Sequence, residues 1–295
     1  MKKPQWITLA AGAILTIAIF VFGRTIPNKK PVAAEAHSEN DGHNHGTLAT
    51  SSFSIDSVLI DVKQQLSPDR VARINQLESA ATTGGSEPLA ISKQLDAYHR
   101  LSHFWGDSAR FLPLYAWYEA EASRLENSEK SLTFAAHLFL NYLFQDEQAG
   151  AEMRKWKALQ AKDLFERSLK INPDNDSSKV GLGACYLFGD ISPAPMQGIS
   201  LIKSVVDKDS THVYGQMMLA KGALTSGQFD KAIDRLTTIC RIQPANLEAL
   251  LLLAESYERT GEKAAAVKWY RESLKHVGLA EAKEAIEKRI ADLSR

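Results

Sequence analysis

The stretch "LEALLLLAESYERTGEKAAAVKWYRESL", residues 247–274, places small and large side chains at fixed spacings. Its first half has apolar residues in the order i, i+3, i+4, i+7, which forms one face of an α-helix: Leu250, Leu253, Ala254 and Tyr257. Gly261 then allows a sharp turn, and Ala266 and Tyr270 begin the apolar face of a second helix. The stretch therefore predicts a helical hairpin, with alanines where the two helices approach each other most closely.

The same pattern occurs earlier in the chain. Four positions of the hairpin have counterparts 34 residues upstream, namely Leu219, Ala220, Gly227 and Ala232. A further unit lies 37 residues before that one, because Leu182 precedes Leu219 by this distance. An insertion of three residues between Tyr186 and Gly198 explains the longer period. Since one hairpin cannot bury its apolar face alone, we expect consecutive hairpins to stack on one another.

This pattern resembles the tetratricopeptide repeat family. The resemblance rests on the period, the pair of small residues, the large aromatic residue and the closing proline of "INPDN" and "IQPAN", and it covers residues 155–274. It implies an all-α fold, a superhelix of helical hairpins. It also implies a concave face, lined by the first helix of each hairpin, that binds a peptide or a helix of a partner.

Upstream of residue 127 the pattern is degenerate but still helical. A helix is expected to start at Pro68, with Ser67 as its cap. A degenerate hairpin is expected to turn at Gly106, with Pro113 kinking or beginning its second helix. The chain is thus divided into five parts: an anchor (1–24), a linker (25–52), degenerate helical repeats (53–126), tetratricopeptide-type repeats (127–280) and a capping helix (281–295).

The N-terminus predicts a single transmembrane helix. Residues 7–23 carry no charge, and at a rise of about 1.5 Å per residue they would span roughly 25 Å, near the lower limit for a bilayer. A secretory signal peptide begins in the same way, but no small-x-small cleavage site directly follows the apolar run. The numbers of basic residues before and after the uncharged run are nearly equal, so they do not by themselves fix the orientation in the membrane. We expect an uncleaved anchor in a bacterial inner membrane, with the C-terminal domain in the periplasm.

The linker, residues 25–52, is rich in Pro, Ala, Asn, Gly and Ser and is expected to remain a flexible tether. It contains His37, His43 and His45. Imidazoles this close together are able to share a divalent metal, so a metal-handling protein is one alternative function. The other interpretation is a solvated tether whose histidines have no such role.

Composition excludes several function classes. The chain has 35 basic and 35 acidic residues, a net charge of zero, whereas a general nucleic-acid binder needs a basic surplus. Cys185 and Cys240 form no CxxC motif and are expected to be buried apolar side chains. His99 and His103 lack the carboxylate of a zinc-hydrolase motif, and the chain has no phosphate loop. We therefore expect no enzyme, metal site, cofactor or small-molecule substrate, and an enzyme with an unrecognised site is the less favoured alternative.

The favoured function is a membrane-tethered scaffold that binds a protein or peptide partner in envelope assembly, secretion or cytochrome maturation. The residues beside the packing face of each first helix should point to the concave surface. The candidate partner-binding residues are His137, Asn141, Tyr214, Met217, Lys221, Thr225, Glu255 and Arg259. The Lys and Asn set of chaperone-binding family members is absent, so the pattern does not support binding to a chaperone C-terminus.

Overall fold

The computed structural model describes residues 53–83, 85, 87–146, 150–192 and 195–295. Contacts divide the chain into two units, residues 1–47 and 48–295, and every described residue belongs to the second. The predicted anchor and linker, 1–24 and 25–52, lie outside the described residues. No helix in the described part of the chain is both long and apolar enough to cross a bilayer.

The described residues contain thirteen α-helices and one π-helical turn, with no strand among them, which confirms the predicted all-α fold. In chain order they are α2 (Ile55–Lys63), α3 (Pro68–Thr82), α4 (Pro88–His103), η1 (Phe104–Ser108), α5 (Leu112–Glu126), α6 (Glu129–Gln145), α7 (Ala151–Ile171), α8 (Asp176–Phe188), α9 (Pro195–Lys208), α10 (Val213–Thr225), α11 (Phe229–Ile242), α12 (Leu247–Arg259), α13 (Lys263–Leu274) and α14 (Ala280–Leu293).

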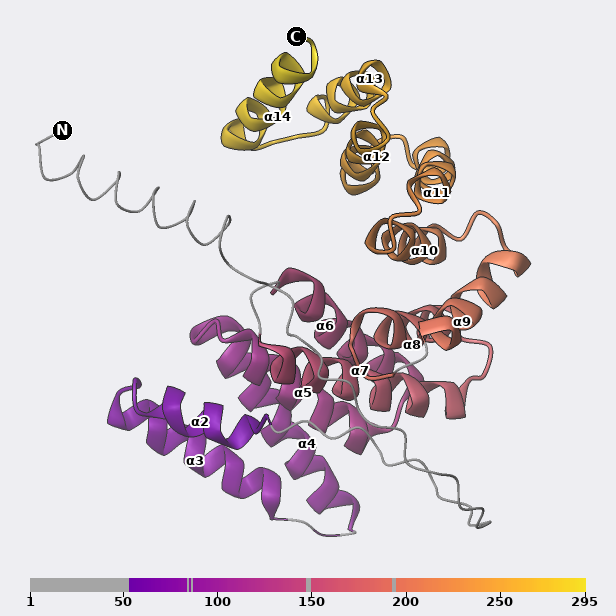
Figure 1. The fold of residues 1–295 in the computed structure, drawn as a ribbon. Coiled ribbons are helices and arrows are strands. Elements are labelled where there is room, and N and C mark those ends of the chain that lie inside the picture. The colour runs from indigo at the N-terminus through magenta and orange to yellow at the C-terminus, as the bar shows by residue number, and fades with distance from the viewer. Residues whose placement is uncertain (1–52, 84, 86, 147–149, 193–194) are drawn as a thin grey trace, which may run out of the picture. The chain divides into compact units, whose positions relative to one another are not determined.

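These helices pair into consecutive antiparallel hairpins (Figure 1). The first helices are α4, α6, α8, α10 and α12, and each packs against the second helix that follows it: α5, α7, α9, α11 or α13. Each first helix also contacts the helix before it in the chain. The stacking expected from the repeat is therefore present, because each hairpin buries its remaining apolar face against the next.

Local sequence signals fix where the helices begin and end. Ser128, Asn175 and Asn246 precede α6, α8 and α12, and their side chains accept a hydrogen bond from the backbone N–H three residues later. This satisfies a donor that the first helical turn leaves unpaired. Gly227 and Gly261 have φ angles of +72° and +84°. Glycine adopts this left-handed conformation without a Cβ penalty, so both turns lie where the sequence predicts them.

The upstream half follows the expectations with differences in detail. Helix α3 starts at Pro68, but Ser67 makes no side-chain capping bond. Pro113 lies in the first turn of α5 and so begins this helix without kinking it. Gly106 is part of the π-helical turn η1, which continues directly from α4. The connection between the two helices therefore lies where the sequence predicts it, but it begins with a π-helical turn and not with an open loop.

The core is a continuous cluster of small and large apolar side chains across the hairpins. Ala254 and Ala266 are both fully buried, as close helix packing requires. The backbones of α8 and α9 also approach closely, because a Cβ on Gly183 would lie 2.7 Å from the backbone oxygen of Gly198. Helix α14 covers the end of the stack: none of its residues is fully buried, and Arg289 Nε donates to Glu258 Oε2 at 2.9 Å.

Candidate functional site

The first helices of four consecutive hairpins line one open groove of about 610 Å³. Helices α6, α8, α10 and α12 each contribute side chains to it. We call it the first-helix groove and define it by its lining residues: Asn141, Phe144, Gln145, Phe188, Lys221, Leu224, Thr225, Glu248 and Leu252. Its volume lies within the roughly 300–1,000 Å³ that is typical of ligand-binding clefts.

Two amides at one end of the groove are available to a ligand. Asn141 and Gln145 lie four residues apart on α6, and both side chains are exposed. Neither amide makes a hydrogen bond to any other described residue. Each carries both donors and an acceptor. The pair is thus able to bond the N–H and C=O groups of an extended peptide backbone.

Lys221 of α10 contacts residues of two other helices that line the groove. Its Nζ lies 2.6 Å from Glu248 Oε1 on α12 and 4.8 Å from the ring centroid of Phe144 on α6. Phe144 in turn makes an edge-to-face contact with Phe188 on α8, with the ring centroids 5.2 Å apart. One lysine therefore links three first helices through an ion pair and a cation–π contact. It also leaves the groove with a basic group beside an acidic one.

The remaining lining is apolar and partly open. Phe144, Phe188, Leu224 and Leu252 are all half-buried. Side chains in this state keep apolar area that a ligand is able to cover. The groove combines unengaged amides, one ion pair and apolar surface, a set that suits binding and holds no nucleophile–base pair.

Three of the eight candidate residues lie in this groove: Asn141, Lys221 and Thr225. Thr225 is exposed, and its hydroxyl donates to the backbone oxygen of Lys221 at 2.9 Å. The structure therefore brings together residues from two hairpins that are far apart in the sequence.

His137 and Tyr214 pack against each other beside the groove. Their ring centroids are 5.4 Å apart, and His137 Nε2 lies 2.9 Å from Ser177 Oγ. Burial lowers the pKa of His137 and raises that of Tyr214. The Tyr214 hydroxyl is buried and has no hydrogen-bond partner among the described residues. Both side chains therefore pack between the first helices α6 and α10.

The remaining candidates lie elsewhere. Met217 is only 5% exposed, which corrects the expectation that it points to the open surface. Helix α10 contacts α8 and α9 as well as α11, so its neighbours cover this side chain. Glu255 and Arg259 are exposed and line a separate recess of about 380 Å³ near α14. Their own side chains pair at 3.4 Å.

Sequence reasoning missed most of the groove's apolar lining. Gln145 and Phe144 carry a usable signal, because they lie four and three residues after Asn141 on one helical face. Phe188 and Leu252 carry none, since their exposure depends on which hairpins lie beside them. The candidates therefore lie on three of the four helices that line the groove, and they do not include its apolar residues.

No cluster of three metal-ligating side chains occurs among the described residues. His37, His43 and His45 lie outside them, so the metal-handling alternative stays a prediction. Cys185 and Cys240 are buried and unpaired, as expected. Burial raises the pKa of both thiols, that of Cys240 to about 11. Neither cysteine therefore has the thiolate character that nucleophiles and metal ligands need.

Comparison with known proteins agrees with this architecture. The tetratricopeptide repeat family model matches residues 217–283, which include α11, α12 and α13. No curated protein matches the chain at the sequence level.

The solved structures to which the chain is similar include three that illustrate the range. PilW, a type IV pilus biogenesis factor, has 14% identity and a TM-score of 0.45, with 77% of this chain and 98% of that chain covered. MamA from Desulfovibrio magneticus RS-1 has 16% identity and a TM-score of 0.43, with coverages of 62% and 94%. YrrB has 13% identity and a TM-score of 0.40, with coverages of 69% and 100%. Such low identities and scores carry no argument about function. The family match identifies residues 217–283 as tetratricopeptide repeat sequence, and the stacked hairpins show the all-α fold of the described residues.

Proposed function

We propose that this protein is a scaffold that binds an extended segment of a protein partner in the first-helix groove. The observation that carries the proposal is the composition of that groove. Four consecutive first helices line it, and it presents the unengaged amides of Asn141 and Gln145 beside half-buried apolar side chains. A peptide offers both a repeating set of backbone hydrogen-bonding groups and apolar side chains, so it matches both parts of the lining.

The Lys221–Glu248 pair gives the groove a polar centre. A partner's carboxylate would compete for Lys221, and a partner's basic side chain would compete for Glu248. In the first exchange Glu248 loses its partner, but its side chain is 55% exposed, so water solvates the freed carboxylate and the desolvation cost of binding stays small. The apolar side chains on either side, Phe144 and Leu252, would then cover the exchanged pair from water. The groove therefore favours a segment with a charged residue between apolar ones.

Site-specific photo-crosslinking in cells that make the full chain tests this proposal. A benzoylphenylalanine is placed at Asn141 or Thr225, both exposed groove positions, and at Lys170, an exposed residue of the second helix α7. We expect one adduct of defined mass from both groove positions and none from Lys170. Thr225→Trp, combined with the probe at Asn141, should remove this adduct by filling the groove. The same adduct from all three positions would contradict the proposal.

We also propose that a single N-terminal helix tethers this scaffold to a membrane, with the repeats in the periplasm. The support is the uncharged run of residues 7–23 and its length. Deletion of residues 1–24 should move the protein from the membrane fraction to the soluble fraction. A reporter that is active on only one side of the membrane, fused after Arg295, tests the orientation. Activity of a cytoplasm-specific reporter would overturn the periplasmic assignment.

A further inference from the structure

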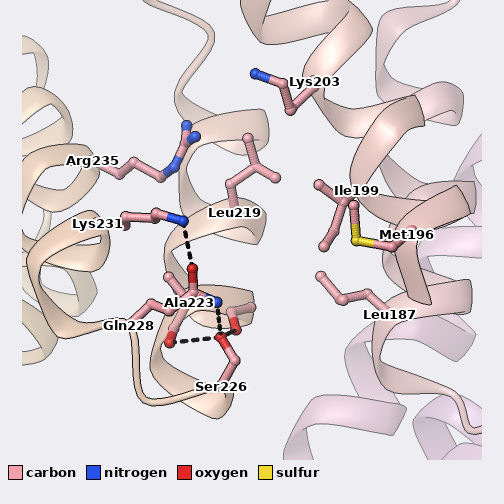
Figure 2. A pocket seen from close by; sticks show the side chains of 11 residues that line it. Leu187, Met196, Ile199, Lys203, Leu219, Ala223, Ser226, Gln228, Lys231 and Arg235 are labelled. Atoms are coloured by element: carbon pink, nitrogen blue, oxygen red, sulfur yellow. Dashed lines mark hydrogen bonds between the residues drawn. The ribbon is translucent and has the colours of Figure 1, made fainter. Parts of the chain in front are cut away.

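A second recess lies between the hairpin of α8 and α9 and the hairpin of α10 and α11 (Figure 2). Its volume is about 440 Å³, and the second helices α9 and α11 form its two sides, with α10 as its floor. It shares no lining residue with the first-helix groove. We call it the α9–α11 cleft and define it by six residues: Met196, Ile199, Leu219, Ala223, Lys231 and Arg235.

One side of the α9–α11 cleft is apolar. Met196 and Ile199 of α9 face the space together with Leu187, which lies in the last turn of α8 (Figure 2). Met196 is 65% exposed, among the most exposed large apolar side chains of the described residues. The floor adds Leu219 and Ala223, which are buried at the bottom of the recess. This side therefore offers apolar area that water now covers.

The opposite side is basic. Lys231 and Arg235 lie four residues apart on α11 and so project from one helical face (Figure 2). Lys231 Nζ donates to Gln228 Oε1 at 2.6 Å, and Arg235 Nη1 donates to Gln216 Oε1 at 2.8 Å. Neither cation forms an ion pair within the described residues. Both are thus held in place by neutral amide oxygens and keep donors for an anion.

Nearby carboxylates reduce the positive charge without cancelling it. Lys203, at the α9 end of the cleft, pairs with Asp207 at 3.3 Å. Burial lowers the pKa of Arg235, while Asp207 and Asp234 act in the opposite direction. Asp234 lies beside Arg235 in an adjoining recess. Lys231 and Arg235 are consequently the cations of the cleft that are left to pair with an anion.

We propose that the α9–α11 cleft is a second binding site, which takes an acidic segment of a protein partner. An apolar side chain of that segment packs on Met196, and flanking carboxylates pair with Lys231 and Arg235. The assignment follows from charge complementarity across the cleft. It is independent of the first-helix groove, so a partner is able to engage both sites or only one.

A protein segment fits the cleft better than a free aliphatic acid does. A fatty acid supplies one carboxylate. The cleft has two cations on successive turns of α11, and both keep hydrogen-bond donors, so it is able to pair with several carboxylates. The cleft is also open along one side, so a chain can enter and leave it, while a lone acyl chain is better covered by a closed cavity. Acidic residues on both sides of one apolar residue supply this combination.

Selection from a displayed library of short random peptides on the purified full chain tests the proposal. We expect enrichment of sequences with an apolar residue between Asp or Glu residues, and loss of that enrichment in high salt. K231Q/R235Q should reduce it by at least about tenfold, because it removes both partners of the carboxylates. Met196→Asp should do the same through the apolar side, and this exposed position carries little folding risk.

Matched controls separate this site from others. K263Q/R271Q removes the same charge from α13, the next second helix, and should leave the enrichment unchanged. Thr225→Trp, which fills the first-helix groove, should also leave it unchanged, so failure of one site is distinguishable from failure of the other. Enrichment that survives K231Q/R235Q would overturn the proposal. Two other results would also overturn it. One is a dimer of the wild-type chain that K231Q/R235Q dissociates, because this would assign the cleft to a second copy of the chain. The other is selective binding of decanoate.

Discussion

Lys221 lies with its Nζ 2.6 Å from Glu248 Oε1, although 27 residues separate the two in the chain. The contact joins α10 to α12, the first helices of neighbouring hairpins, at the floor of the groove that we assign to a partner. It is a polar link between first helices of different hairpins, as is the contact between His137 and Ser177. Lys221 is 22% exposed and Glu248 55% exposed in their side chains, so solvent screens the pair only in part.

We predict that this pair contributes measurably to stability. A double-mutant cycle with Lys221→Met and Glu248→Gln should give a coupling of about 0.5–1 kcal/mol at low salt, measured by urea denaturation. The coupling should fall as salt rises, because the pair is partly exposed. The Glu255–Arg259 pair of α12, which is more exposed and lies within one helix, should couple by about 0.3–0.5 kcal/mol and serves as the control. A coupling no larger than the control would contradict the prediction.

Close packing between α8 and α9 makes a second prediction. A Cβ on Gly183 would lie 2.7 Å from the backbone oxygen of Gly198 and 2.6 Å from Ile202 Cγ1. Backbone cannot move aside cheaply, so Gly183→Ala should lower the free energy of unfolding by about 2 kcal/mol.

The control is Gly222→Ala on α10. Its added Cβ would lie 2.7 Å from Leu187 Cδ2, the end of a side chain that is able to rotate away. The greater helix propensity of alanine, about 1 kcal/mol, should offset that adjustment and leave stability nearly unchanged. Urea denaturation compares the two variants directly. Equal effects would show that the α8–α9 contact is softer than its geometry indicates.

A third prediction concerns pH. Burial lowers the pKa of His137, so the folded protein binds this proton less readily than the unfolded chain, whose histidines titrate near pH 6.5. Stability from the neutral imidazole is therefore present above about pH 6.5 and is lost as the pH falls below that value. The slope from one proton is at most about 1.4 kcal/mol per pH unit.

Urea unfolding of the wild-type chain and of His137→Gln, across this pH range, measures the effect. The variant cannot take up the proton, so its stability should fall less steeply in acid than that of the wild type. The difference between the two curves isolates His137 from the other titrating groups. Parallel curves would mean that His137 remains as easily protonated in the fold as in the unfolded chain.

The sequence alone was sufficient for the hairpins. Gly227 and Gly261 mark turns, and Pro68 marks a helix start, through contacts between residues only a few positions apart. The alternation of Ala254 with large apolar residues specifies the packing face by the same local geometry. Such signals lie within one helix or one turn, so the period and the all-α fold are legible without coordinates.

Only the tertiary structure defines the two surfaces that we propose for partner binding. Met217 and Lys221 lie one turn apart on α10, yet the first is covered and the second lines the groove, because α8, α9 and α11 pack against α10 and leave only part of its surface open. Likewise, Met196 faces Arg235 only because two hairpins leave space between α9 and α11. Exposure depends on neighbours distant in the chain, and their placement is set by how whole hairpins stack on one another.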